Sequence, residues 1–340
     1  MSTQAQVQQM PALKKKDFVS DQEVRWCPGC GDYAILNAVQ QVFPTLGIPK
    51  EKFAIVSGIG CSSRFPYYMN TYGFHTIHGR APAFATGLKL ANPELDVWVI
   101  TGDGDGLSIG GNHLLHVLRR NIDLQILLFN NQIYGLTKGQ YSPTSQVGIV
   151  TPSSPLGSID QPIVPVRFAL GARATFVARA FDTSKRLPES LSAAREHKGA
   201  SFIEILQNCP VFNDGIFELI TDRKTGPAYQ LWLEHGQPMR FGANGEKGLR
   251  LDANTLSLEI ATIGEDGVTE ADILVHDETN PSLAWMLADL PEVVALGVIY
   301  RQPGPVYNES LRVQRELAEE RFGEPDLHAL LRQGHTWTVS

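Results

Sequence analysis

Short apolar runs recur along the first 206 residues and are separated by segments in which apolar residues return at helical spacing. Each run is short enough to form one strand, and Gly, Asn or charged residues bound it, as expected for strands buried inside a sheet. The pattern predicts strands at residues 53–56, 97–100, 124–129, 174–178 and 202–206.

Between these runs the apolar positions follow a period of about 3.6 residues, which is typical of amphipathic helices. Tyr33, Leu36, Val39 and Phe43 fall on one face of the first such segment, and Asp32 is placed to cap it. Helices are also expected at residues 81–90, 112–119 and 184–196. Strands that alternate with helices predict an α/β fold with a doubly wound, mostly parallel sheet.

The texture of the chain changes after Cys209. Short elements at 229–235, 257–262, 283–290 and 309–321 are separated by Gly, Pro and Asp, and no motif with readable chemistry occurs among them. We therefore divide the chain into a flexible tail (1–20), an α/β domain (21–212) and a C-terminal extension or arm (213–340). A Ser/Thr/Pro/Gly-rich loop at 143–165 is long enough to cover a site or meet a partner.

Charge and composition exclude several classes of protein. The formal net charge of −7 over 340 residues argues against general nucleic-acid binding, and the basic run at 14–16 lies in the polar tail. No apolar run approaches the roughly 18–20 residues of a membrane span, and the first residues are too polar for a signal peptide. We expect a soluble cytoplasmic protein with no nucleic acid and no membrane among its partners.

Polar residues follow two of the predicted strands. Asp103, between Gly102 and Gly104, comes after the run at 97–100, and Asn131 ends the next run. Open α/β sheets bind ligands at the carboxyl ends of their strands, where a helix start can hold phosphate and glycines allow close approach. Since Mg²⁺ takes oxygen ligands, the pattern predicts a diphosphate–Mg²⁺ site, with an ordinary Gly-Asp turn or a nucleotide site as alternatives.

This pair of motifs resembles the thiamine diphosphate signature, in which GDG is followed by NN. Asn131 follows Asp103 by 28 positions, the separation that this family requires. The resemblance implies that Asp103 and Asn131 are the side-chain ligands of Mg²⁺ and that the carbonyl of Ile133 is a third ligand. It also implies that Gly104 and Asp105 lie against the diphosphate of the cofactor.

The four cysteines occur in distinctive contexts. Cys27 and Cys30 form a Cys-x-x-Cys turn with Pro and Gly inside it, whereas Cys61 and Cys209 each follow a predicted strand. A disulfide framework is not expected in an intracellular protein of this size. A redox dithiol, zinc ligands, iron–sulfur ligands and a scatter of buried thiols all stay open on the residues alone.

Taken together, the motifs resemble the β subunit of a 2-oxoacid:ferredoxin oxidoreductase, with the 2-oxoglutarate type as the best match. The resemblance covers about residues 22–240 and rests on Trp26-Cys27-Pro28-Gly29-Cys30-Gly31, Gly60-Cys61-Ser62-Ser63, His78-Gly79-Arg80, Gly102-Asp103-Gly104-Asp105, Ile109-Gly110-Gly111-Asn112-His113, Asn130-Asn131-x-Ile133-Tyr134-Gly135-Leu136-Thr137 and Gly139-Gln140. It implies a diphosphate-binding α/β domain and one [4Fe–4S] cluster held by Cys27, Cys30, Cys61 and Cys209, which disfavours zinc.

The resemblance also implies further contacts. Those with thiamine diphosphate come from Ile59, Gly60, Cys61, Ser62, His78, Gly102, Gly104, Asp105, Tyr134, Gly135, Leu136 and Thr137. Arg64, Leu136 and Lys138 are expected to contact the 2-oxoacid, although Arg64 and Lys138 could also be solvated surface charges. Many close relatives have Gly where Lys138 stands, which weakens that assignment. His113 and His116 are expected to be structural, because no third metal ligand accompanies them.

The chain lacks a second α/β domain that could supply the glutamate needed to activate thiamine diphosphate. The resemblance therefore implies a partner α subunit, or a fused γ–α subunit, in an α2β2 assembly. The expected activity is CoA-dependent oxidative decarboxylation of 2-oxoglutarate to succinyl-CoA, with electrons passing to ferredoxin. Pyruvate or a broad range of 2-oxoacids are alternative substrates. A non-oxidative decarboxylase subunit and a zinc-stabilised scaffold subunit are alternatives of other classes.

Overall fold

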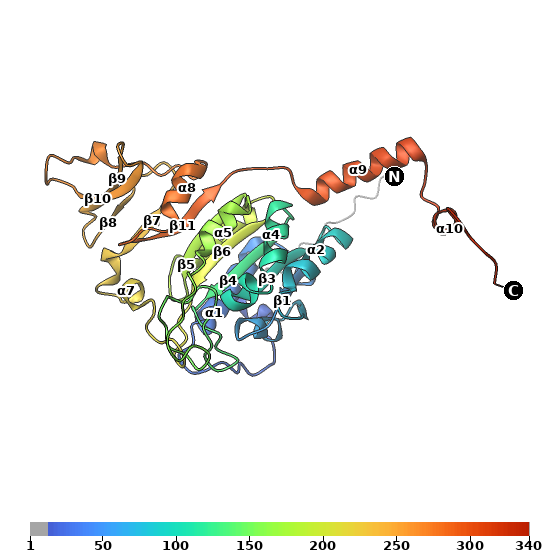
Figure 1. The fold of residues 1–340 in the computed structure, drawn as a ribbon, viewed down its shortest axis with the longest axis horizontal. Helices are drawn as coiled ribbons and strands as arrows, with labels where there is room; N and C mark the ends of the chain where they lie inside the picture. Colours follow the sequence, from blue (N-terminus) through green and yellow to red (C-terminus); the bar gives the residue numbers. More distant parts are fainter. Residues whose placement is uncertain (1–12, 340) are drawn as a thin grey trace, which may run out of the picture.

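A computed structural model describes residues 13–339, and an eight-stranded sheet runs through this part of the chain (Figure 1). Along the sheet β11 is antiparallel to β5, and the other neighbouring strands are parallel. The strands in spatial order are β2 (Tyr72–His75), β1 (Phe53–Ser57), β3 (Asp96–Gly102), β4 (Gln125–Asn130), β6 (Ser201–Leu206), β5 (Phe176–Phe181), β11 (Val294–Arg301) and β7 (Gln230–Leu233). The predicted mostly parallel α/β sheet is confirmed.

Helices cover both faces of this sheet. One face packs against α1 (Asp32–Val42) and α6 (Leu187–Glu196). The other packs against α2 (Ala81–Ala91), α4 (Gly111–Arg119), α5 (Pro165–Gly171) and α8 (Pro281–Leu287). The sheet is therefore doubly wound, as the sequence pattern predicts.

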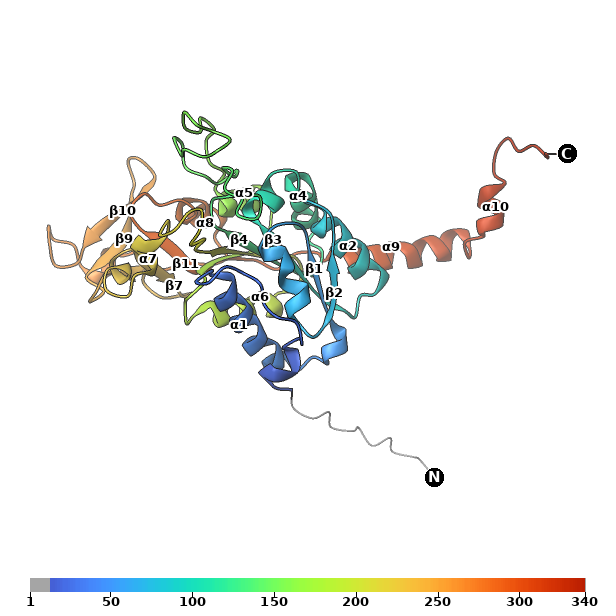
Figure 2. The same ribbon diagram turned by 90° about the horizontal axis from the view of Figure 1, so that it is seen from below.

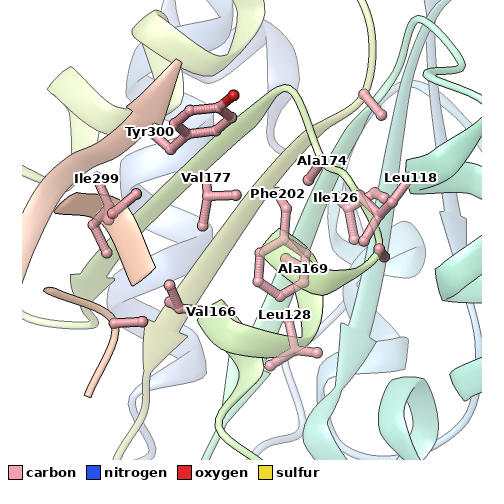
Figure 3. Close-up of a cluster of buried hydrophobic side chains, with 14 of the residues drawn as sticks. Leu118, Ile126, Leu128, Val166, Ala169, Ala174, Val177, Phe202, Ile299 and Tyr300 are labelled. Carbon is pink, nitrogen blue, oxygen red and sulfur yellow. The ribbon is translucent and has the colours of Figure 1, made fainter. Parts of the chain in front are cut away.

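The central strands are apolar along their whole length because both of their faces are buried. In β4, Ile126 and Leu128 point to one helical layer and Leu127 and Phe129 to the other. Figure 3 shows the first layer, where Val166 and Ala169 of α5 lie against these strands. All six residues of β4 are buried, and this leaves its carboxyl end as the place where polar chemistry can begin.

Residues 15–18 belong to the packed domain rather than to a flexible tail. They form a short 3-10 helix, and Phe18 is completely buried, with its ring 5.6 Å from that of Phe43 and 5.5 Å from that of Phe53. The remainder of the predicted tail, residues 1–12, lies outside the described residues.

The C-terminal region is only partly an arm. Its strands β7 and β11 complete the main sheet. A three-stranded antiparallel sheet lies to one side of the main sheet (Figure 1). This small sheet contains β8 (Arg240–Phe241), β9 (Lys247–Asp252) and β10 (Ser257–Thr262). Beyond residue 305, α9 (Tyr307–Phe322) and α10 (Leu327–Leu331) extend away from the domain, and α9 has no buried residue (Figures 1 and 2).

Short elements complete the fold. They are α3 (Asp103–Leu107), α7 (Glu218–Thr221) and the 3-10 helices Lys15–Phe18, Phe43–Leu46, Lys50–Lys52, Ser62–Tyr68, Gly226–Ala228 and Glu270–Asp272. Within residues 13–339, no helix has the length and apolar character needed to span a membrane.

Candidate active site

The carboxyl ends of β1, β3 and β4 surround a cavity of about 400 Å³. Every residue that we predicted to contact thiamine diphosphate or Mg²⁺ lines this cavity, and the rest of its lining comes from Asp32, Phe129 and Gln140. The parallel strand order explains this convergence, because β1, β3 and β4 are neighbours and end at the same edge. The structure thus brings together residues that lie as far apart as Ile59 and Thr137 in the sequence.

Asp103 is the first residue of α3 and is almost completely buried, with 2% of its surface exposed. Its Oδ2 accepts hydrogen bonds from Ser142 Oγ (2.5 Å) and Thr144 Oγ1 (2.6 Å). Burial raises the pKa of this carboxyl, and the hydrogen bonds from the two hydroxyls act in the opposite direction and lower it. Among residues 13–339 no Lys, Arg or His forms an ion pair with Asp103. A bound cation fits this buried carboxylate, because it would supply the missing positive charge.

Asn130 and Asn131 have different roles although they are adjacent. Asn130 is buried and donates through Nδ2 to Glu204 Oε1 at 2.7 Å. The other carboxylate oxygen of Glu204 pairs with Arg179. Asn131 lines the cavity and donates through Nδ2 to Gln207 Oε1 (2.8 Å), while its own Oδ1 accepts the backbone N–H of Ile133 at 3.2 Å and keeps a second lone pair. Asn131 is therefore the amide available to a metal ion, and Asn130 supports the sheet.

Gly104 is required by close packing. A Cβ atom at this position would lie 2.4 Å from Cε1 of Tyr134, whose hydroxyl donates to the carbonyl of Gly104 at 2.8 Å. The tyrosine ring therefore lies directly against the Gly-Asp-Gly segment and forms part of the cavity wall. Any larger residue would displace the ring and narrow the space beside Asp103.

Asp105 also lines the cavity, but protein donors occupy its carboxylate. Oδ1 accepts from the backbone N–H groups of Ile59 (3.0 Å) and Gly79 (2.7 Å) and lies 2.7 Å from His78 Nδ1. Oδ2 accepts from Thr101 Oγ1 at 2.7 Å. Asp105 thus holds the turns after β1 and before α2 against the end of β3, and we assign it to the frame of the cavity.

All four cysteines line a second cavity of about 220 Å³. Cys61 also lines the larger cavity, so the two cavities share a wall that contains Cys61, Asn131, Gly135 and Leu136. A Cβ atom on Gly135 would lie 3.6 Å from the sulfur of Cys209 and 3.7 Å from that of Cys61. The thiols therefore surround a space that adjoins the predicted cofactor site.

The surroundings of these thiols suit a cationic group. Among residues 13–339 no three Cys, His, Asp or Glu side chains approach one point closely enough to hold a metal ion. Burial, together with nearby Asp32, raises the pKa of Cys61 to about 11 and that of Cys30 further. A cationic iron–sulfur core would offset this cost by stabilising the thiolates.

Asp32 is not the N-cap of the first long helix, although the sequence predicts that it is. Gly31 occupies the N-cap position of α1, and Asp32 is the first helical residue, buried beside Cys30. Burial raises the pKa of Asp32 to about 7, a hydrogen bond with Cys30 opposes this, and nearby Asp182 raises the pKa further. The prediction was wrong because the chain enters the helix one residue earlier than the polar side chain suggests.

The three residues predicted to contact the substrate do not all line the same cavity. Leu136 lines both cavities, whereas Arg64 and Lys138 line the cysteine cavity. Arg64 donates through Nη1 to the carbonyl of Arg25 at 2.8 Å. Lys138 is exposed and has a φ of +78°, a backbone conformation that favours glycine. A glycine at this position would adopt this conformation without strain.

Three residues that hydrogen-bond to predicted site residues are not among those predicted from the sequence. Ser142 and Thr144 bond to Asp103, and Gln207 lies between Asn131 and Cys30. A signal for the first two was present, because the run from Ser142 to Ser145 is rich in hydroxyls at the start of the long loop. Gln207 carried no comparable signal beyond its place after a strand.

Comparisons with known proteins agree with this geometry. Residues 58–205 match the family described as thiamine pyrophosphate enzyme, C-terminal TPP binding domain. The chain is 53% identical over 336 residues to 2-oxoglutarate oxidoreductase subunit KorB of Mycobacterium tuberculosis, which covers 96% of this chain and 88% of that relative. It is 49% identical over 193 residues to the 2-oxoacid:ferredoxin oxidoreductase subunit beta of Saccharolobus solfataricus, which covers 56% of this chain and 63% of that relative.

A solved structure extends the likeness to the fold. It is the 2-oxoglutarate:ferredoxin oxidoreductase from Magnetococcus marinus with 2-oxoglutarate, coenzyme A and succinyl-CoA bound. The chain aligns with it at a TM-score of 0.74 and 34% sequence identity, over 96% of this chain and 98% of that chain. The alignment therefore includes most of the C-terminal region.

Proposed function

Because this chain belongs to the family of 2-oxoacid:ferredoxin oxidoreductase β subunits, we propose that it catalyses, with a partner subunit, the CoA-dependent oxidative decarboxylation of 2-oxoglutarate. The products are succinyl-CoA and CO2, and two electrons leave singly to ferredoxin. The observation that carries this proposal is the wall shared by the diphosphate cavity and the four-cysteine cavity. It would keep the electron donor and the first electron acceptor next to each other.

Two groups of this chain's residues would hold the cofactors. Asp103, Asn131 and the carbonyl of Ile133 would bind Mg²⁺, with the diphosphate beside Gly102 and Gly104. The four cysteines would bind one [4Fe–4S] cluster. When bound, thiamine diphosphate supplies an electron sink for decarboxylation, and the cluster supplies a one-electron acceptor. Tyr134, Leu136 and Ile133 would restrict water around the reacting carbon.

Recognition of the substrate would rest on cations near the shared wall. The 2-oxoglutarate dianion carries a second carboxylate, which Arg64 can hold in a bidentate manner and Lys138 can attract as a point charge. Leu136 would contact the carbon chain from between the two cavities. Pyruvate or a broader range of 2-oxoacids is the alternative, and it would follow if these cations serve another role.

The assembly would complete the site. We propose a partner α subunit, alone or fused as γ–α, that donates the glutamate for cofactor activation in an α2β2 enzyme of the cytoplasm. The loop at 143–165 fits a role at this interface, because Val150, Leu156 and Ile159 are exposed apolar residues, while Thr144 within the loop and Ser142 just before it bond to Asp103. Ferredoxin and coenzyme A are the other partners.

The test is anaerobic purification with the co-expressed partner, followed by quantification of iron, sulfide, zinc and thiamine. About four irons and four sulfides per β chain with one thiamine diphosphate, and ferredoxin reduction that needs both CoA and 2-oxoglutarate, would support the proposal. Thiamine without iron would favour a non-oxidative decarboxylase. Zinc without thiamine would favour a scaffold subunit and overturn the proposal.

A further inference from the structure

Gln207 connects the two halves of the site. It follows β6, is 1% exposed, and its backbone N–H donates to the carbonyl of Asn130 at 2.9 Å. Its Oε1 accepts from Asn131 Nδ2 at 2.8 Å, and its Nε2 donates to the sulfur of Cys30 at 3.2 Å. One side chain therefore touches a predicted magnesium ligand at one end and a predicted cluster ligand at the other.

The direction of this hydrogen-bond chain is fixed by its surroundings. Gln207 Nε2 also donates to the carbonyl of Asn208 at 2.6 Å, so a reversed amide would place two oxygens against each other. With its orientation set, Gln207 presents Oε1 to Asn131, which must answer with Nδ2. Asn131 Oδ1 accepts the N–H of Ile133 at 3.2 Å and keeps its second lone pair for the metal ion, and a proton of Gln207 points at the sulfur.

Packing keeps Gln207 in this position. A Cβ atom on Gly31 would lie 3.0 Å from Cγ of Gln207, so the turn after Cys30 lies directly against the stem of the side chain. The side chain cannot swing toward the turn without displacing it. A merely space-filling residue here would need no amide, whereas both polar ends of Gln207 have partners.

We propose that Gln207 is a positioning residue that couples occupancy of the Mg²⁺–thiamine diphosphate site to the reduction potential of the iron–sulfur cluster. This inference rests on the proposed function. A hydrogen bond to a ligating sulfur stabilises the more negative, reduced cluster and raises its potential. Mg²⁺ bound to Asn131 Oδ1 polarises that amide, which strengthens its bond to Gln207 and, in turn, the bond to Cys30.

The coupling is reciprocal, because binding and reduction are linked equilibria. If the reduced enzyme binds the magnesium cofactor tenfold more tightly than the oxidised enzyme, the cofactor raises the potential of this one-electron couple by about 59 mV. A loaded cofactor site would then favour the arrival of an electron at the cluster. No atom or proton moves through Gln207 in this role.

The test is a redox titration of the assembled, anaerobically purified enzyme, followed by electron paramagnetic resonance. The wild type is measured with Mg²⁺–thiamine diphosphate and after its removal with EDTA. We expect the midpoint potential to be higher with the cofactor. Gln207→Met keeps the volume and loses the hydrogen bonds to Asn131 and Cys30, so its potential should be lower and nearly independent of the cofactor. Its calorimetric affinity for Mg²⁺–thiamine diphosphate should fall about tenfold or more.

Gln40→Met is the matched control, because Gln40 is also a buried amide but donates to the carbonyl of Tyr68, and neither residue lines the cofactor cavity or the cysteine cavity. It should behave like the wild type. A wild-type potential that ignores the cofactor overturns the inference even if the Gln207 variant fails to assemble, and so does an unchanged potential in Gln207→Met. A wild type with no iron overturns the proposed function and this inference together, whereas an intact cluster with an uncoupled potential overturns this inference alone.

Discussion

Thr144 donates a 2.6 Å hydrogen bond to the carboxylate of Asp103, 41 positions earlier in the chain. Both residues are 2% exposed, and Ser142 donates to the same oxygen at 2.5 Å. The two hydroxyls occupy Oδ2 and leave Oδ1 as the oxygen that can meet a metal ion. The start of the long loop is thereby attached to the predicted magnesium site.

The double variant Ser142→Ala, Thr144→Val should weaken Mg²⁺ binding about 10- to 100-fold, because partners that orient a metal ligand contribute about that much to affinity. The measurement is the dissociation constant for Mg²⁺ at saturating thiamine diphosphate. Iron content should not change. Ser153→Ala, on the exposed part of the same loop, is the control and should bind Mg²⁺ normally. Unchanged affinity in the double variant would remove the positioning role.

Asp103→Ala should abolish binding of Mg²⁺–thiamine diphosphate and leave the visible absorbance of the cluster intact. The reason is that Asp103 supplies an anionic oxygen in the cofactor cavity and lines no part of the cysteine cavity. Binding is measured by quantifying thiamine in the purified complex. Full activity in this variant would refute the site.

Asp105→Ala should act on stability instead. It removes the acceptor of the backbone N–H groups of Ile59 and Gly79, and an unsatisfied buried donor costs about 1–3 kcal/mol. We expect a lower thermal midpoint than in Asp103→Ala, measured side by side. Equal midpoints would mean that the two turns do not depend on this carboxylate.

The two aspartates show where sequence reasoning succeeds and where it stops. The Gly-Asp-Gly motif and the Asn pair lie on neighbouring parallel strands, so local pattern and spacing were enough to bring Asp103 and Asn131 together. The different task of Asp105 depends on Ile59 and Gly79, which meet it only after three strand ends have assembled. No local pattern contains that information.

Long-range pairing explains the other misses. Tyr72–His75 is an edge strand whose residues are all exposed, so it lacks the apolar run that marks the central strands. Strand β11 joins the sheet beside β5 although more than a hundred residues separate them. The polar neighbours of Phe18 predict a place in the tail, yet its ring packs edge-on against the stacked rings of Phe43 and Phe53.

Cys209→Ser should remove or alter the cluster and stop ferredoxin reduction while thiamine diphosphate still binds. Cys209 is buried in the cysteine cavity and does not line the cofactor cavity, so the effect should be confined to one cofactor. Iron content and resonance spectra give the first result, and thiamine content gives the second. Unchanged electron transfer to ferredoxin would show that the four-cysteine ligand set is wrong.

His197 lies outside both cavities and makes the stability of the fold depend on pH. His197 is buried, and its Nε2 lies 2.8 Å from Thr175 Oγ1. The Thr175 hydroxyl donates to Asn121 Oδ1, which also accepts the N–H of Ala200, so His197 must be the donor to Thr175. Burial, with a smaller effect of nearby Arg301, lowers the pKa of His197 to about 4, whereas nearby Asp123 opposes this shift.

The folded protein therefore keeps this imidazole neutral while the unfolded chain protonates it near pH 6.5. Between about pH 6.5 and pH 4 the unfolded state binds more protons at this residue, so stability falls as pH falls. His197→Gln retains a donor for Thr175 and has no such titration. The difference in thermal midpoint between wild type and variant should thus shift in favour of the variant from pH 7.5 to pH 5.5. Because both proteins share every other titrating group, midpoints that fall in parallel would show that His197 ionises freely in the fold.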